Sequence, residues 1–571
     1  MYRRLKYLFL LIVSTFPLIG NAQSNSPVMP EYIRTFSADW GALERVYTIR
    51  YSPEYYERMD ALTEDWLQRL AALSYDELSG SDKIDYQLLK NELKTRGKRL
   101  EQDRLRFQSV NHVVDFAEPL YQFIVERRRG AAPDSRQVAG NMQEAIELTA
   151  LKMDELKDGE PFPSWQRAQQ AEELVNDLRK NLEWAFSFYH LYHPDFSWWV
   201  EKPHEDLQLK LSEYADFLSE FFSNPEELDD GSGIFGNPLG SEALENEIAS
   251  EMIPYTAQDL IDYAWVEFEW CREQLKMAAG EMGFGENYMA AIEQVKNTWV
   301  EPGEQPPLIH YFAEEAIEFL EENDLLTIPE LAKETWRMRM LSPEMQRFAP
   351  FFLGGEQVQI AFPTSTMEHD LKMMSLRGNN PHFSRAVVHH ELIPGHHLQQ
   401  FMASRYNVHR NAFRTPFWVE GWALYWEMLL WEKNFARNAE DKIGMLFWRI
   451  HRAARIIFSL KYHLGEMTPA ECIDFLVDHV GHERANAEAE VRRSFEGRYG
   501  PLYQISYMVG GLQMMALRSE LVDSGKMDEK TFHDRIMREN SMPVEMLRAI
   551  LIAEYPARDH KTSWYFLEQL R

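Results

Sequence analysis

A cluster of histidines is the part of this sequence with the clearest chemical potential. Four of the 18 histidines lie within residues 389–397, and Glu391 directly follows His390. A His-Glu pair opens the His-Glu-x-x-His pattern, in which two histidines on one helix face bind zinc and the glutamate acts as a base. Here Pro394 and Gly395 lengthen the pattern by two residues. The segment is therefore either a damaged zinc motif or a lengthened one.

A regular helix would not bring these histidines to one metal ion. His390 and His396 are six residues apart, which corresponds to about 600° of rotation, so their side chains point in different directions. The histidines that are seven residues apart, 389 with 396 or 390 with 397, share a face, but their Cα atoms are about 10.5 Å apart. That span is long for one ion with zinc–nitrogen bonds of about 2.1 Å.

The residues between these histidines predict a break in the helix. Pro394 has no backbone N–H, and its ring clashes with the carbonyl group four residues earlier, which belongs to His390. Ile393 precedes a proline and is therefore disfavoured in helical geometry. Gly395 can adopt the dihedral angles that a distortion requires. We therefore expect His390 and His396 to converge on one ion, whereas the histidines at 389 and 397 point elsewhere.

A second segment supplies the candidate third ligand. Residues 418–427 read Trp-Val-Glu-Gly-Trp-Ala-Leu-Tyr-Trp-Glu, so Glu420 and Glu427 are seven residues apart and share one face of a helix. Gly421 and Ala423 are small enough to let another helix approach closely. We predict that Glu420 binds the metal and that Glu427 accepts a hydrogen bond from a ligand imidazole, which fixes its tautomer. The alternative for Glu420 is an ordinary surface glutamate, which its aromatic surroundings disfavour.

This set of residues is typical of a hydrolytic metal site. Three protein ligands leave a fourth position for water, which distinguishes catalytic from structural zinc sites. Glu391 is placed to take a proton from that water while zinc polarises the scissile carbonyl group. Two imidazoles and one carboxylate suit one Zn²⁺ ion per chain, although the spacing alone leaves manganese and cobalt open.

The rest of the sequence predicts a mainly α fold around this site. Apolar residues recur at three- and four-residue intervals, which is typical of helices, through residues 53–107, 137–156, 165–188 and 204–222. Residues 354–362 instead alternate between apolar and polar side chains, which indicates a short β-strand. That strand is either part of a surface hairpin or lies at the edge of the active cleft, where its backbone could pair with an extended peptide.

The N-terminus has the pattern of an export signal. A basic start precedes an apolar run that ends at the small residues Gly20-Asn21-Ala22. The alternative is a membrane anchor, but the run is shorter than the ~20 apolar residues that span a bilayer. No cysteine lies near the expected cleavage site, which argues against a lipid anchor. We expect residues 1–22 to be removed and the mature protein to be periplasmic or extracellular, without stable membrane insertion.

Composition limits the partners and the domain organisation. The formal net charge of −30 argues against nucleic acid as a partner and favours cationic substrates, or reflects only a solvated surface. No internal repeat or long linker is evident, so we expect one large body over residues 23–571, with a helical half over about 23–345 and a metal-binding half over about 346–571. Cys271 and Cys472 are expected to be free and buried, although pairing is the alternative.

The motifs resemble those of a bacterial family known as domain of unknown function family 885. The resemblance rests on residues 390–399 and 420–425 and, more weakly, on residues 81–89, so it spans most of the mature chain. It implies a large helical fold similar to thimet oligopeptidase and angiotensin-converting enzyme, with a deep central cleft and a zinc peptidase site. The chemistry of the family is poorly settled, so the resemblance implies no particular substrate.

Downstream positions match the family pattern only in part. Arg455 and His463 fit, but Ser459 and Lys461 stand where family members tend to have Asp and Gly. Tyr507 matches a later Ser-Tyr motif. We predict that Tyr507 and His463 donate hydrogen bonds to the oxyanion of a tetrahedral intermediate, although a single Tyr or His is more often a packing residue.

The sequence therefore favours an exported zinc metallopeptidase that hydrolyses short peptides, with Glu391 as the general base. A zinc hydrolase of a non-peptide amide or ester is the first alternative, because the same activated water attacks any acyl centre. A non-catalytic peptide-binding protein is the second. The presence of Glu391 argues against it, because binding alone needs no general base.

Overall fold

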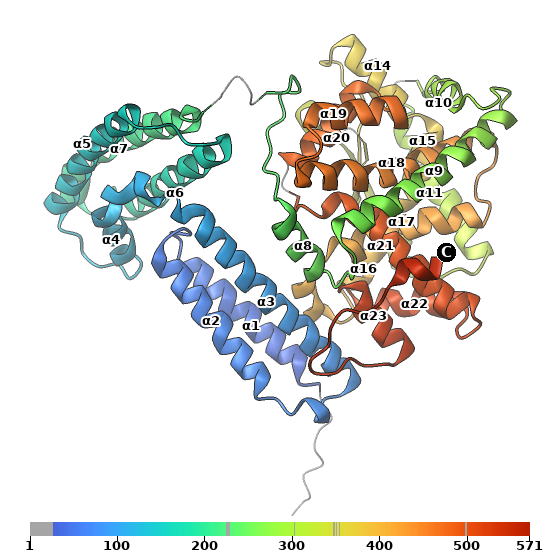
Figure 1. Ribbon diagram of the computed structural model, residues 1–571, viewed down its shortest axis with the longest axis horizontal. Helices are drawn as coiled ribbons and strands as arrows, with labels where there is room; N and C mark the ends of the chain where they lie inside the picture. The colour runs from blue at the N-terminus through green and yellow to red at the C-terminus, as the bar shows by residue number, and fades with distance from the viewer. Residues whose placement is uncertain are drawn as a thin grey trace, which may run out of the picture.

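We describe a computed structural model of the chain, which is a mainly α protein with one two-stranded sheet (Figure 1). The structure describes residues 27–223, 229–301, 303–346, 349, 351–352, 354–496 and 499–570. The expected signal segment, residues 1–22, lies outside the described residues. Within those residues, no helix combines the length and the apolar character that crossing a lipid bilayer would require. The predicted fold class is confirmed.

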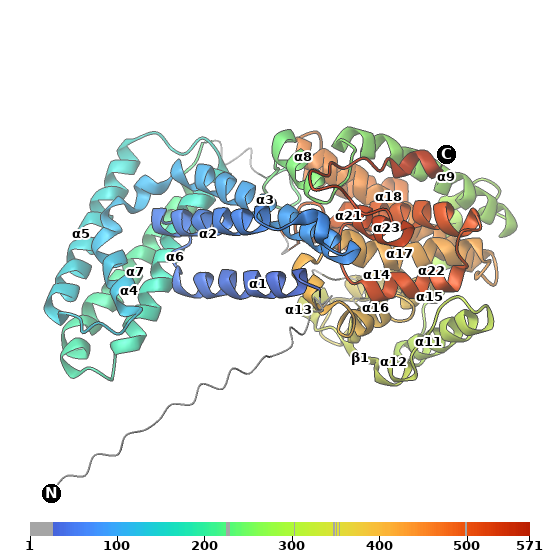
Figure 2. The same ribbon diagram turned by 90° about the horizontal axis from the view of Figure 1, so that it is seen from below.

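The first three helices form an elongated layer between the two ends of the molecule (Figures 1 and 2). They are α1 (Met29–Val46), α2 (Pro53–Ala71) and α3 (Gly80–Gln108). Ser52 and Ser79 cap α2 and α3 by accepting hydrogen bonds from the first-turn N–H groups of Tyr55 and Asp82. Trp66 on α2 packs edge-on against Phe36 on α1. This layer shares one hydrophobic cluster with the C-terminal part of the chain.

The next four helices form a lobe with a hydrophobic cluster of its own. They are α4 (Glu118–Arg127), α5 (Ser135–Asp158), α6 (Trp165–Tyr189) and α7 (Pro194–Glu220). Helix α7 begins before the position expected near His204 and continues through Pro203, which lacks an N–H donor for the helix. The lobe lies at one end of the molecule, and the helices that follow it in the chain lie at the other end (Figure 1).

The remaining helices form the body that contains the site. Their bounds are α8 (Ser241–Ser250), α9 (Ala257–Glu281), α10 (Tyr288–Lys296), α11 (Gln305–Glu322), α12 (Glu330–Thr335), α13 (Pro343–Gln346), α14 (His369–Gly378), α15 (Pro381–Glu391), α16 (His396–Ala403), α17 (Pro416–Glu432), α18 (Ala439–Leu464), α19 (Pro469–Phe475), α20 (Arg484–Phe495), α21 (Tyr503–Arg518), α22 (Glu529–Glu539) and α23 (Val544–Ile552). Helix α17 packs closely on α21, and α18 packs on α9 and α15. One hydrophobic cluster groups Ile49 with buried residues between 107 and 218, and the larger cluster contains residues on both sides of residue 345.

The described part of the chain contains the strands β1 (Arg337–Met340) and β2 (Gln357–Ile360). They pair in parallel, with Met338 opposite Val358, so they do not form the hairpin that the sequence left open. Val358 and Ile360 are fully buried, while the two glutamines of β2 are half-buried. The alternating pattern of this segment is confirmed.

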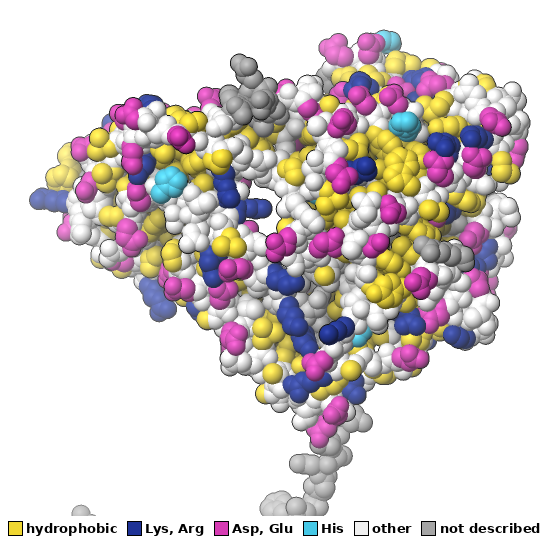
Figure 3. Space-filling view, in the orientation of Figure 1, with side chains coloured by type: hydrophobic (Ala, Val, Ile, Leu, Met, Phe, Trp, Pro, Cys, Tyr) yellow, Lys and Arg dark blue, Asp and Glu magenta, His cyan; other side chains and the backbone are white. Residues whose placement is uncertain are grey.

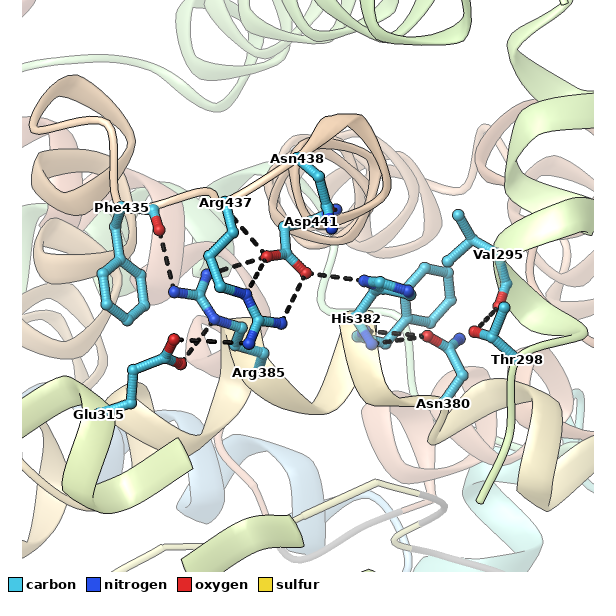
Figure 4. A network of polar contacts seen from close by, with 11 residues as sticks. Val295, Thr298, Glu315, Asn380, His382, Arg385, Phe435, Arg437, Asn438 and Asp441 are labelled. Carbon is cyan, nitrogen blue, oxygen red and sulfur yellow. Dashed lines mark hydrogen bonds and ion pairs between the residues drawn. The ribbon is translucent and has the colours of Figure 1, made fainter. Parts of the chain in front are cut away.

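A buried charge network fixes helix α15 against its neighbours (Figure 4). Asp441, in the first turn of α18, lies between His382 of α15 and Arg437, and its carboxylate oxygens approach His382 Nδ1 and Arg437 Nε at 2.7 Å. Arg385 of α15 donates to Glu315 of α11 at 2.7 Å. Burial would raise the pKa of Asp441, but the bonds from His382 and Arg437 outweigh it and hold that pKa below its usual value. These ion pairs fix the first part of α15, the helix that ends in His390-Glu391, to its neighbours.

Replacing Asp441 with Asn should lower the free energy of unfolding by about 3 kcal/mol, because it leaves the buried guanidinium group of Arg385 and the His382 ring without their carboxylate. Thermal or urea unfolding measures the change. The matched control is Lys442→Gln, which breaks only a surface pair with Glu281 and should change stability by less than about 0.5 kcal/mol. Equal effects of the two substitutions would contradict the structural role of Asp441.

Candidate metal centre

The helix that carries the first histidine stops directly after it. Helix α15 ends at Glu391 and α16 begins at His396, with non-helical backbone angles at Leu392 and Gly395. A Cβ atom on Gly395 would lie 1.7 Å from the carbonyl oxygen of His390, so only glycine fits at this position. The predicted break between the two histidines is confirmed.

Two hydrogen bonds fix the interruption to helix α17. Trp422 donates from its indole N–H to the carbonyl oxygen of Pro394 at 2.9 Å. Gln399 of α16 donates to the carbonyl oxygen of Trp418 at 3.0 Å. Because Glu420 lies between these two tryptophans on α17, the same bonds set the position of both histidines relative to this carboxylate.

The structure brings His390, His396 and Glu420 together. One oxygen of Glu420 lies 3.1 Å from His396 Nε2 and 3.6 Å from His390 Nε2. Ligand atoms around a tetrahedral ion with bonds of about 2.1 Å are about 3.4 Å apart, so these separations fit one zinc ion. Glu391 also has a carboxylate oxygen within 4.8 Å of the ligand atoms of both histidines. The donor set therefore fits a metal ion with a carboxylate beside it.

Glu427 lies behind the first histidine, as the sequence predicts. Its carboxylate oxygen is 2.6 Å from His390 Nδ1 and accepts a hydrogen bond from Arg452 at 3.3 Å. A proton on Nδ1 leaves Nε2 as the lone-pair atom that faces Glu420. Burial would raise the pKa of Glu427, but Arg452 and His390 outweigh it and hold this pKa at about 2.

The carboxylates around His390 stabilise a positive charge at this position. Burial alone would lower the pKa of His390, but its bonds to Glu420 and Glu427 outweigh burial and raise that pKa to about 9. Without a metal, the imidazole itself would therefore take a proton. A divalent ion supplies the same positive charge in place of that proton. Burial raises the pKa of Glu391, which is the direction of shift that a general base at neutral pH would need.

The two flanking histidines point away from the site. The ring of His389 packs edge-on against Phe435, 5.7 Å between centroids, and burial lowers its pKa to about 4. His397 Nε2 lies 2.9 Å from the carbonyl oxygen of Ala332 in helix α12. Both positions agree with the sequence prediction.

A cavity of about 260 Å³ opens onto the metal-site residues. Gly354 lies in its wall, and a Cβ at that position would be 2.2 Å from a carboxylate oxygen of Glu391, so the loop before β2 packs directly on this carboxylate. Gln359 of β2 lines the same cavity. The strand thus lies at the edge of the site, as one of the two sequence interpretations held.

Two tyrosines on α21 connect to the metal-site carboxylate. Tyr503 donates a hydrogen bond to Glu420 at 2.6 Å, and Tyr507 donates to the Tyr503 hydroxyl at 3.0 Å. The Tyr507 ring also stacks on His390, with 5.9 Å between centroids. Burial, followed by the charge of Glu420, raises the pKa of Tyr507 to about 12, so this hydroxyl keeps its proton. Sequence reasoning missed Tyr503, although its four-residue spacing from Tyr507 places both on one helix face.

The structure does not bring His463 to the cavity. It lies eight residues beyond Arg455 on α18, about 12 Å along the axis, and its ring contacts Tyr462 and Phe495. Burial lowers its pKa to about 4. His463 packs near the end of α18, away from the described residues that line the cavity, so the geometry gives no support to its predicted hydrogen bond to an oxyanion.

A contact between two glycines sets the distance between helices α17 and α21. A Cβ on Gly421 would lie 2.6 Å from Gly510 Cα, and a Cβ on Gly510 would lie 2.2 Å from the carbonyl oxygen of Phe417. The helix backbones therefore touch, which places Glu420 within hydrogen-bond distance of Tyr503. The close approach predicted from the small residue after Glu420 is confirmed.

The sequence of the chain now places it among known proteins. Residues 38–551 match the family described as "Bacterial protein of unknown function (DUF885)". This chain belongs to that family. No curated protein matches the chain.

Two solved structures share the fold of this DUF885 protein. A proposed lipoprotein of unknown function from Shewanella oneidensis aligns with a TM-score of 0.68 and 18% identity over 92% of this chain and 100% of its own. A proposed lipoprotein from Colwellia psychrerythraea aligns with a TM-score of 0.59 and 15% identity over 92% of this chain and 98% of its own. At these identities the similarity shows the fold alone.

Replacing Glu427 with Gln should weaken metal binding about 10- to 100-fold, because the amide holds the Nδ1 proton of His390 less strongly than a carboxylate does. Competition with a fluorescent zinc chelator measures the dissociation constant. The unfolding curve of the metal-free variant serves as the control for misfolding. Unchanged affinity would remove Glu427 from the site.

Replacing Gly510 with Ala should push α17 away from α21, lowering the free energy of unfolding by about 1–3 kcal/mol and weakening metal binding. Gly140→Ala in α5 is the matched control, because a Cβ there meets nothing within 4 Å. A glycine-to-alanine change at such a helical site should stabilise the protein by about 0.5–1 kcal/mol. The same sign of change in both variants would contradict the close helix contact.

Proposed function

We propose that this protein is an exported zinc-dependent peptidase that hydrolyses short peptides. The observation that carries the proposal is the convergence of His390 Nε2, His396 Nε2 and a Glu420 oxygen at the separations of a tetrahedral site, with Glu391 beside them. A structural metal site would need no further carboxylate at this place. The cavity in front of these residues gives a substrate access to them.

The residues of the chain have distinct parts in the proposed reaction. When bound, zinc polarises the scissile carbonyl group and makes water more acidic. Glu391 accepts the proton from the attacking water and delivers it to the leaving nitrogen. Tyr507 exchanges its hydrogen bond to Tyr503 for one to the developing oxyanion. Tyr503 holds the ligand Glu420 in place through its hydrogen bond, and Glu427 holds the ligand His390 in place.

The surroundings of the site favour a peptide over other acyl substrates. β2 borders the cavity through Gln359, and among the described residues only one of its two edges pairs with another strand. An extended peptide can pair with a free strand edge through main-chain hydrogen bonds. The volume of the cavity, about 260 Å³, is just below the ~300–1,000 Å³ of typical ligand sites. A cavity of this size favours a short peptide segment.

Export is part of the proposal. Residues 1–22 have the pattern of a cleaved signal, and the two similar structures are proposed lipoproteins. The cysteines of this chain are Cys271 and Cys472, both free and buried, so neither provides a lipid-attachment site near residue 22. We therefore propose export, with neither cysteine as the attachment point of a lipid.

Glu391→Gln should retain one zinc ion per chain and lose peptide cleavage by at least about 10³-fold in kcat, because it removes the general base and keeps the ligands. His396→Ala should lose the metal and activity together. Zinc content is measured by elemental mass spectrometry, and cleavage by a peptide-library digest with and without a chelator. Turnover of Glu391→Gln at the wild-type rate would refute the assignment, as would chelator-resistant cleavage by the wild type.

A further inference from the structure

The charge of the cavity is opposite to the charge of the whole chain. The protein carries a formal charge of −30, and Asp and Glu side chains are spread over the face in Figure 3. Among the described residues, however, the cavity is lined by four arginines and two carboxylates, Glu391 and Glu420, which belong to the candidate metal site. The arginines are Arg414, Arg452, Arg455 and Arg493. The interior of the site is therefore cationic.

Three of these arginines are buried with unused donors. Arg452, Arg455 and Arg493 are 4%, 2% and 6% exposed. Among the described residues, no hydrogen-bond partner exists for the Nε of Arg452, the Nη1 of Arg455, or the Nε and Nη2 of Arg493. Buried donors are nearly always paired, so such a group lining a cavity indicates a missing acceptor.

The three buried arginines also outnumber the carboxylates that form ion pairs with them by one. Glu427 pairs with Arg452 at 3.3 Å, and Glu490 pairs with Arg455 at 2.7 Å and with Arg493 at 3.7 Å. Two carboxylates thus face three guanidinium groups within the described part of the chain. Rings of Tyr499 and Tyr507, 4.9 Å and 4.4 Å from guanidinium carbons, offset part of the charge. A buried unpaired charge is costly, so an external anion would stabilise it.

A carboxylate is the anion that fits these groups best. The planar fork of a guanidinium matches the two oxygens of a carboxylate, and such charge-assisted bonds are roughly twice as strong as neutral ones. The Tyr507 ring, which stacks on His390, also lies against Arg455. One tyrosine ring thus separates the arginines from the metal ligands, a distance that a short peptide spans.

We infer that Arg452, Arg455 and Arg493 form a subsite for a substrate carboxylate, so that the enzyme acts on short peptides with a free carboxylate near the scissile bond. The inference rests on the proposed function and specifies its substrate class. It replaces the expectation, drawn from the net charge alone, that the substrates are cationic.

The first test compares N-acetyl-Ala-Ala-Phe-Ala with its C-terminal carboxamide. The wild type should cleave the free acid with a kcat/KM about 10- to 100-fold higher, the effect of charge-assisted hydrogen bonds. A second pair, the carboxamides of N-acetyl-Ala-Ala-Phe-Glu and N-acetyl-Ala-Ala-Phe-Gln, distinguishes a side-chain carboxylate from a C-terminal one. A preference for the acid in either pair supports the subsite and shows whether it recognises a C-terminal or a side-chain carboxylate.

The second test measures binding without turnover. Calorimetry with the Glu391→Gln protein should give a dissociation constant about 10- to 100-fold lower for the free acid than for the carboxamide. This arm separates the two proposals. A binding preference in a protein whose wild type cleaves no peptide would refute the peptidase function and support the subsite.

Substitution of Arg493 tests the residues themselves. Arg493→Gln should reduce the preference for the free acid to about threefold or less, while Arg493→Lys, which keeps the charge and loses the fork, should fall between. Arg484→Gln is the matched control on the same helix, because Arg484 pairs with Asp474 at the surface. Zinc content and thermal unfolding confirm that each variant is folded. Equal binding and cleavage of acid and carboxamide in both pairs by the wild type would overturn the subsite.

Discussion

The geometry of the site depends on residue 395 being a glycine, which has no Cβ atom. The carbonyl group of His390 occupies the space where a Cβ of residue 395 would lie, and this contact lets the chain turn from the end of α15 into the start of α16. A continuous helix would direct the two imidazoles to different sides. The interruption makes His390 and His396 neighbours, with their ring centroids 4.8 Å apart. Contacts from the neighbouring helices keep the two histidines in this arrangement.

The surrounding helices secure it from two directions. On one side, Trp422 and Gln399 attach the turn and α16 to α17, and the glycine contact brings α17 against α21. On the other, Asp441 and Arg385 hold the first part of α15 against α18 and α11. The site is thus assembled by helix ends and close backbone contacts within one body, while the lobe of α4–α7 packs around a separate core.

Sequence reasoning succeeded where the local chemistry dictates the backbone. Pro394 and Gly395 predict the helix break because their effects act on neighbouring atoms, and the seven-residue spacing of Glu420 and Glu427 follows from helix geometry. It failed where the outcome depends on which helices meet. Tyr503 reaches Glu420, 83 residues away in sequence, only because α17 packs on α21. His463 and the buried arginines show the same limit, since a position along α18 or α20 does not reveal which turns face the cavity.

The contrast between an acidic exterior and a cationic cavity has a consequence for how a peptide would reach the proposed site. An anionic peptide is repelled at long range by the field of the whole molecule and attracted only after it enters the cavity. Salt shortens the range of that field, from about 30 Å at 0.01 M to about 8 Å at 0.15 M. Moderate ionic strength would therefore speed the encounter with an anionic substrate, whereas a cationic peptide would be captured most readily in dilute buffer and turned away at the arginines.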